Sequence, residues 1–150
     1  MRTGAALAAV WTMLGAACGG GPAPPDAVAA LCTDQAPAAP TFANVQVLFT
    51  SCTACHTNIV PLDLDPDVSY ANLVGKAPPS YTNPLVDETC GGVLVMPGDP
   101  AASYLYQKLT QPTPCAGSQM PLSEFGVPTP LPACYPALIH DWIAAGAPND

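Results

Sequence analysis

Short apolar stretches at helical spacing alternate along this chain with long stretches rich in proline. The first stretch follows Thr41, a residue type that caps helices, and leads directly into Cys52. Its apolar face consists of Phe42, Val45, Leu48 and Phe49. The last stretch runs from Pro136 to Gly146. Its apolar face consists of Leu138, Ile139, Trp142 and Ile143. Each stretch predicts a helix that is buried along one face.

Two more helices are predicted between these stretches. Asp67 can cap a helix over residues 68–74, and a glycine follows as the residue that ends it. Asp99, followed by a proline, marks the start of a helix that reaches about Thr110. Loops are expected over residues 57–67, 76–98 and 111–133. Because no alternating pattern is long enough for a sheet, the expected fold class is all-α, with roughly three to five short helices.

Residues 1–17 are typical of an export signal. Arg2 supplies the positive start, and the apolar run over residues 5–14 is too short to span a bilayer as a mature helix. Small residues then lead to Cys18. The chain is therefore expected to be exported, and this segment is left out of the fold.

The residues around Cys18 resemble the lipobox of bacterial lipoproteins, with the sequence Leu14-Gly15-Ala16-Ala17-Cys18. In that family the cysteine is lipidated and becomes the mature N-terminus. Gly15 holds the place where lipoboxes usually carry a branched apolar residue. The alternative is an ordinary secretory signal cut after Ala17, which would leave Cys18 to form a disulfide.

Residues 18–40 are rich in glycine and proline and predict a tether, with room for a short helical piece around residues 27–31. The globular domain is expected over residues 41–150. With a lipid on Cys18, the tether would hold that domain at the periplasmic or cell-envelope face of a bacterial membrane.

The composition is acidic, since 3 lysine and arginine residues stand against 11 aspartate and glutamate residues and give a net charge of −8. This balance excludes nucleic-acid binding, which needs a basic face to neutralise phosphates. An acidic surface instead favours a partner protein with a basic docking face. The 7 cysteines indicate an oxidising compartment.

The sequence Cys52-Thr53-Ala54-Cys55-His56 has the pattern that anchors a c-type haem. Two thiols add across the two vinyl groups of a haem, and one helical turn between the cysteines points both sulfurs at the same edge of the ring. The adjacent His56 then reaches under the ring and ligates the iron. Short helices joined by long loops make a poor core, and one buried haem per chain would supply the missing apolar surface.

A haem iron with one histidine has a second axial position to fill. Met120 is the expected ligand, because it lies in a loop between two helices and Pro121 would stiffen that loop. Met96 is also followed by a proline, but its apolar neighbours predict core packing. His140 is the third candidate and is expected to face solvent from the last helix.

With these residues, the chain resembles the single-haem cytochrome c domains of bacterial secreted proteins and lipoproteins over about residues 41–148. The matching pieces are Cys52-Thr53-Ala54-Cys55-His56, Tyr70-Ala71-Asn72-Leu73-Val74, Pro97-Gly98-Asp99-Pro100, Ser103-Tyr104-Leu105, Gln119-Met120-Pro121 and Asp141-Trp142-Ile143-Ala144-Ala145-Gly146-Ala147-Pro148. The resemblance implies a cytochrome c-like fold whose N- and C-terminal helices cross near Trp142. It also implies a His56–iron–Met120 axis and an electron carrier. The chain departs from the family at Cys134 and Pro136, where acidic residues are usual, so the last helix is expected to begin late; an arginine is usual in the place of His140.

Four cysteines remain after the haem pair and Cys18 are assigned, and they permit three pairings. Cys90 and Cys115 bracket the helix that starts at Asp99, so a bridge between them would brace the loop that carries the methionine. Cys32 and Cys134 precede the first and last helices, which the cytochrome fold would bring together. We therefore predict the disulfides Cys90–Cys115 and Cys32–Cys134.

The expected function is a membrane-tethered electron carrier with haem c, which has no substrate chemistry of its own and is not an enzyme. One alternative is the haem domain of a peroxidase-like or other oxidoreductase system, which needs an open sixth position. Another is a haem-free, disulfide-stabilised surface module in which Cys52 and Cys55 pair. A thioredoxin-like role lacks a βαβ pattern, a zinc site lacks a second close cysteine pair, and no serine–histidine–acid set supports a hydrolase.

Overall fold

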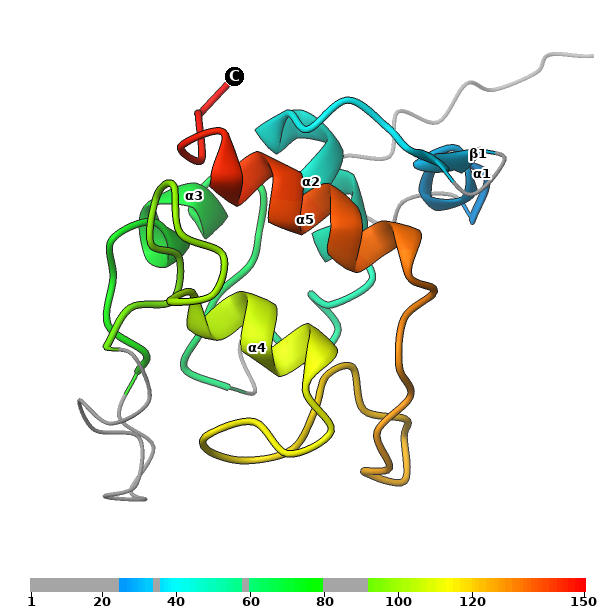
Figure 1. The fold of residues 1–150 in the computed structure, drawn as a ribbon. Helices are drawn as coiled ribbons and strands as arrows, with labels where there is room; N and C mark the ends of the chain where they lie inside the picture. Colours follow the sequence, from blue (N-terminus) through cyan, green and yellow to red (C-terminus); the bar gives the residue numbers. More distant parts are fainter. Residues whose placement is uncertain (1–24, 34–35, 58–59, 80–91) are drawn as a thin grey trace, which may run out of the picture.

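The described part of the chain folds into short helices and one pair of very short strands (Figure 1). This computed structural model describes residues 25–33, 36–57, 60–79 and 92–150. The elements in order are α1 (Pro25–Ala29), β1 (Cys32–Thr33), β2 (Ala36–Pro37), α2 (Phe42–Phe49), α3 (Ser69–Leu73), α4 (Tyr104–Thr110) and α5 (Cys134–Ala144). The mostly helical content agrees with the predicted all-α class. The antiparallel pairing of β1 with β2 was not predicted.

The core lies where α5 contacts both α2 and α4. The predicted apolar face of α2 is buried, and so is that of α5, where Leu138, Ile139, Trp142 and Ile143 are fully covered. The Trp142 ring lies 5.4 Å from the Phe42 ring, measured between centroids, and its Nε1 donates to the carbonyl of Pro148 at 2.9 Å. Helical spacing therefore predicted the contact faces of α2 and α5 correctly.

The start of α2 was predicted correctly, but the start of α5 was not. Thr41 caps α2 as expected, with its Oγ1 accepting from the backbone N–H of Asn44 at 3.3 Å. The prediction of a late start for the last helix is wrong, because α5 begins at Cys134. Pro136 is the third residue of α5, where a backbone N–H has no acceptor within the helix, so the proline ring costs no hydrogen bond.

α3 and α4 lie within their predicted ranges but begin differently. Asp67 does not cap α3, because the carbonyl of Asp65 accepts from the first N–H groups of that turn. α4 begins at Tyr104 and not at Asp99, although the Asp99 carboxylate does accept from the N–H of Ala102 at 3.0 Å. The N–H groups of Tyr104 and Leu105 donate to the carbonyls of Val93 and Leu94, at 3.0 and 2.9 Å, and not to the turn that follows Asp99.

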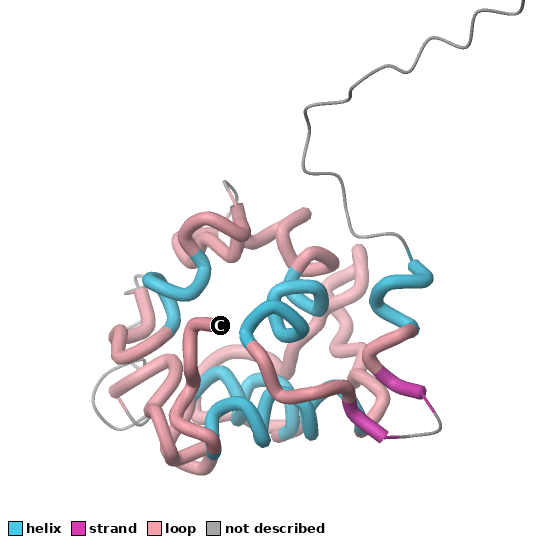
Figure 2. Tube along the Cα trace, turned by 90° about the horizontal axis from the view of Figure 1, so that it is seen from above, coloured by secondary structure: helices cyan, strands magenta, loops and turns pink. Residues whose placement is uncertain are grey.

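The segment before α2 is attached to α5. Figure 2 shows its two strands, in magenta, at the edge of the described chain. The predicted disulfide Cys32–Cys134 is present, with 5.9 Å between its Cα atoms, and Leu31 beside it is buried. The tyrosine hydroxyl of Tyr135 donates to the carbonyl of Val28 at 3.4 Å. The described parts of the predicted tether, residues 25–33 and 36–40, thus pack against the helices.

Several predictions concern residues outside the described ranges. They include the export signal over residues 1–17, the lipidation of Cys18 and the Cys90 half of the second disulfide. Its other half, Cys115, is described and is disulfide-bonded. Among the helices that are described, none has the length and apolar character needed to cross a membrane.

Candidate cofactor site

An apolar cavity lies between α4, the end of α2 and the loops that flank them. Its volume is about 220 Å³, and it opens to solvent on one side. Its walls are almost entirely apolar, and they come from segments spread over most of the described chain. The lining residues are Phe49, Cys52, His56, Leu62, Leu64, Pro78, Pro79, Leu94, Tyr104, Leu105, Lys108, Leu109, Ala116, Gly117 and Met120.

The motif Cys52 to His56 forms a turn that continues from α2. The N–H of Cys52 donates to the carbonyl of Phe49 at 2.7 Å. The N–H groups of Cys55 and His56 then both donate to the carbonyl of Cys52, at 3.2 and 2.9 Å. This is the helical turn that the spacing predicts. Cys52 and His56 line the cavity, whereas Cys55 is exposed to solvent and is not a lining residue.

The thiols of Cys52 and Cys55 are free and are not disulfide-bonded to each other. Burial raises the pKa of the Cys52 thiol above its ordinary value, and the nearby Cys55 acts in the same direction. A thiol with a raised pKa is a weak nucleophile for disulfide exchange and a poor thiolate donor for zinc. Nowhere in the described ranges do three or more histidine, cysteine or acidic side chains gather in a way that could hold a metal ion.

The imidazole of His56 is oriented by a backbone carbonyl. Its Nδ1 lies 3.2 Å from the carbonyl oxygen of Leu62. A carbonyl can only accept, so Nδ1 carries the proton and Nε2 carries the lone pair in the neutral ring. Burial lowers the pKa of His56 below its ordinary value, which favours this neutral form. A neutral ring with a fixed tautomer is the form that ligates a metal.

Met120 comes from the loop after α4 and lines the same cavity. Its N–H donates to the carbonyl of Lys108 at 2.7 Å, so the loop is held against the helix. The structure therefore brings Cys52, His56 and Met120 to one cavity from two distant parts of the chain, while Cys55 stays at an exposed position of the same turn.

The two other candidate ligands lie elsewhere. Met96 is 36% exposed and does not line the cavity, so its predicted core packing is wrong. The two residues before it, Leu94 and Val95, take the buried positions, and the chain then turns outward. The side chain of His140 is 45% exposed, as expected, and its Nδ1 lies 2.9 Å from the Asp141 carboxylate.

Sequence reasoning missed two contributors to this site. The Leu62 carbonyl could not be foreseen, because its place depends on the path of an irregular loop. Lys108 gave a usable signal, since it stands four residues after Tyr104 and three after Leu105 and therefore shares their helix face. All three side chains line the cavity.

The residues of this cavity could hold an apolar group that carries a metal. The walls can cover an apolar macrocycle. The lining residues Cys52, His56 and Met120 add a thiol, an imidazole and a thioether. Such a donor set matches haem iron better than a hard cation, which prefers oxygen ligands. Comparison with protein-family models, curated proteins and solved structures found no match, so the assignment rests on the residues themselves.

Proposed function

We propose that this protein is an electron carrier with one covalently bound c-type haem in the cavity beside α4. The observation that carries the proposal is the convergence of Cys52, His56 and Met120 on one apolar cavity. An attachment thiol, a neutral imidazole and a thioether each have a distinct task at a haem, and they arise here from segments that are distant in sequence.

The proposed roles follow from the local geometry. Cys52 and Cys55 form the thioether bonds, and the turn between them keeps their backbones one helical turn apart. His56 ligates through Nε2, while its Nδ1–H is held by the carbonyl of Leu62. When bound, the haem supplies a one-electron couple, in which ferric iron accepts an electron from a reduced donor protein and ferrous iron returns it to an oxidised acceptor protein.

Met120 gives the site its proposed character as a closed centre. A thioether ligand stabilises ferrous iron and raises the reduction potential, and it leaves no position for a substrate. The apolar walls keep water from the centre. These properties favour electron transfer over substrate chemistry, so the protein would not act as an enzyme.

The setting of the carrier is also a proposal. An export signal would deliver the chain to a compartment where haem is attached, and a lipid on Cys18 would hold it at the cell-envelope face of a bacterial membrane. The net charge of −8 favours redox partners whose docking faces are basic.

The first experiment tests haem attachment. The full chain is produced in a bacterial periplasm together with a cytochrome c maturation system, and its intact mass is measured after denaturation. We expect a mass gain of one haem and the visible spectrum of low-spin haem c. The double variant Cys52→Ser with Cys55→Ser should lose all covalent haem. A haem-free wild-type protein under these conditions would favour the disulfide-stabilised surface module.

The second experiment tests the axial methionine. Met120→Ala should abolish the weak sulfur-to-iron absorption band of the ferric protein, and the matched control Met96→Ala should retain it. The reduced wild-type protein should not bind carbon monoxide. Carbon monoxide binding by the wild type would contradict the closed centre and favour a peroxidase-like haem domain.

A further inference from the structure

A dense set of contacts joins α4 to residues 116–120, which we call the Met120 loop. The hydroxyl of Tyr104 donates to the carbonyl of Ala116 at 2.7 Å, and the ammonium of Lys108 donates to the same carbonyl at 3.2 Å. The Lys108 ammonium also donates to the carbonyl of Ser118. One lysine thus binds the loop on both sides of Gly117.

The end of α4 binds the same loop through its backbone. The carbonyl of Lys108 accepts from the N–H of Met120 at 2.7 Å, and the carbonyl of Leu109 accepts from the side-chain amide of Gln119 at 3.0 Å. The last carbonyls of a helix have no N–H partner within the helix. The loop supplies donors to two of these carbonyls, which would otherwise need water. Lys108 therefore contacts the loop through both its side chain and its backbone.

Gly117 permits the close approach of the lysine. A Cβ atom built at this position would lie 3.0 Å from the Lys108 Nζ, and the residue has a φ of +66°. The first observation shows that the ammonium lies close to the backbone at Gly117. The second shows that the loop turns there through a conformation that favours glycine.

The charge of Lys108 is unusual for its surroundings. The side chain is half-buried and lines the apolar cavity, and its Nζ lies 5.9 Å from the centre of the Tyr104 ring. The ion pairs of the described residues include none that joins Lys108 to a carboxylate. A positive charge beside a low-dielectric cavity, with no carboxylate of the described residues paired to it, raises the local potential and so favours the gain of an electron there.

We propose that Lys108 is the positioning residue of the Met120 loop and that its charge would favour the reduced state of a haem bound in the cavity. The ammonium and the backbone carbonyl of Lys108 hold the loop so that the Met120 thioether reaches the cavity. The bias toward reduction rests on the proposed haem function, whereas the positioning of the loop does not.

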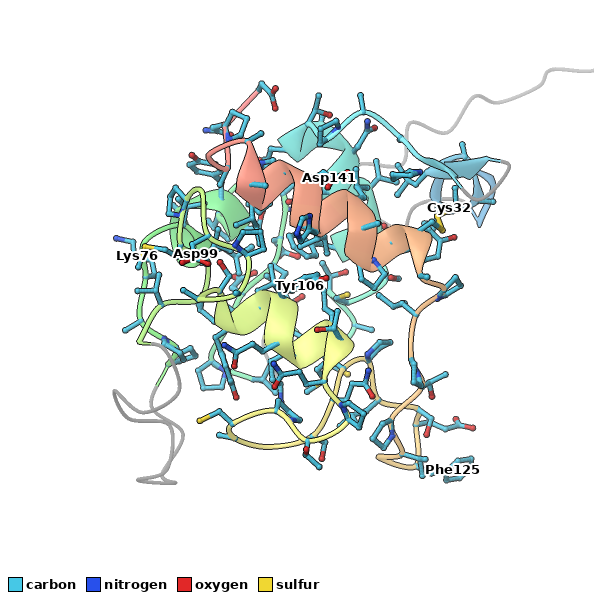
Figure 3. All side chains as sticks on the ribbon, viewed as in Figure 1. Cys32, Lys76, Asp99, Tyr106, Phe125 and Asp141 are labelled. Carbon is cyan, nitrogen blue, oxygen red and sulfur yellow. A yellow bond between two sulfur atoms is a disulfide. The ribbon has the colours of Figure 1, made fainter. Side chains whose placement is uncertain are left out.

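The first test measures hydrogen exchange in the Met120 loop, in the whole protein that remains after the export signal is removed. Lys108→Met removes the donors and the charge, and Lys108→Gln keeps an amide donor without the charge. The matched control is Lys76→Met, which removes the other lysine, whose side chain is exposed and lies at the edge of the molecule (Figure 3). Hydrogen exchange of the amides over residues 116–120 is followed by mass spectrometry, with the amides of α5 as the internal reference.

We expect exchange in the Met120 loop to accelerate about tenfold or more in Lys108→Met, the factor that corresponds to losing a hydrogen bond from a charged donor. Lys76→Met should match the wild type, and α5 should stay protected in both. Equal exchange in Lys108→Met and Lys76→Met would overturn the positioning role. If circular dichroism shows that Lys108→Met does not fold, Lys108→Gln decides the question, with a several-fold acceleration expected.

The second test uses the haem-loaded ferric protein. Imidazole competes with a weakly held axial methionine, and the loss of the sulfur-to-iron band reports the displacement. About tenfold less imidazole should suffice in Lys108→Met than in Lys76→Met. The reduction potential should fall in both Lys108→Met and Lys108→Gln but not in Lys76→Met, and an unchanged potential in Lys108→Gln would overturn the charge role. A chain without covalent haem would defeat the proposed function, yet the exchange experiment would still decide the positioning role.

Discussion

The two sides of this protein are filled in different ways. Where α2 meets α5, side chains fill the interior completely, and Val45, Leu138 and Trp142 have no exposed surface. Beside α4, by contrast, Leu105 and Leu109 are buried but face an apolar cavity of about 220 Å³ that opens to solvent. Side chains that line such a cavity lack packed neighbours on that side, so their burial stabilises the fold less than burial between α2 and α5.

The difference assigns separate tasks to the two sides. The filled side is complete without any ligand, and α2 leads from it straight into the turn that carries Cys52 and His56. The cavity side supplies the walls and the Met120 loop. Mutations on the filled side should therefore act on global stability with or without a cofactor, whereas those on the cavity side should depend on what the cavity contains.

Trp142→Ala should give the largest loss of stability. The side chain is fully covered, packs against Phe42 and bonds the carbonyl of Pro148. Truncation of a buried tryptophan costs about 3–5 kcal/mol, because it removes apolar contacts and leaves a cavity. Urea unfolding of the haem-free and haem-loaded chains should show a similar loss, with Trp142→Phe as the milder control. A much larger loss in one of the two forms would break the distinction between the sides.

Replacing Cys32 and Cys134 together with serine tests the attachment of residues 25–40. Removal of a native disulfide from a small domain costs about 2–5 kcal/mol, and the loop closed here is long. Limited proteolysis should cleave residues 25–40 faster in the double variant, while α5 remains protected from hydrogen exchange. Equal cleavage rates in the variant and the wild type would mean that Leu31 and its neighbours hold this segment without the bridge.

The features that sequence predicted well are those set by local periodicity. The buried faces of α2 and α5 and the cap at Thr41 depend on residues within a few turns of each other. Helix starts were less predictable when distant groups compete for the backbone. For example, the first N–H groups of α4, those of Tyr104 and Leu105, donate to the carbonyls of Val93 and Leu94. The packing of residues 25–33 and 36–40 was missed because Leu31 is the one fully buried apolar side chain among these described residues, which are rich in alanine and proline.

The candidate site divides in the same way. The spacing of Cys52 and His56 gave the turn, and the choice of Met120 over Met96 agrees with which methionine lines the cavity. The Leu62 carbonyl could not be foreseen, because its position depends on how an irregular loop returns. Lys108 could have been found from its helix face, but its contacts with the Met120 loop depend on the path of that loop.

Leu105→Ala and Leu138→Ala form a matched pair across the two sides. Both leucines are buried, but only Leu105 faces the cavity. In the haem-free chain, Leu105→Ala should cost about 1–2 kcal/mol less than Leu138→Ala, because its neighbours already lack contacts on one side. In the haem-loaded chain, the two costs should converge. Urea unfolding of both variants in both forms measures this, and a constant gap would mean that nothing packs against Leu105 when haem is attached.

His140→Gln should have the smallest effect, because His140 belongs to neither side of the comparison. It is partly exposed on α5, and its contact with Asp141 is a surface pair of a kind that contributes about 0–1 kcal/mol. We expect a free energy of unfolding within about 0.5 kcal/mol of the wild-type value and an unchanged sulfur-to-iron band. Asp141→Asn is the matched control, since it removes the charge of the partner and keeps the histidine (Figure 3). A wild type that lacks this band, together with a haem spectrum that changes in His140→Gln but not in Met120→Ala, would show that the last helix reaches the iron and that Met120 is not the ligand.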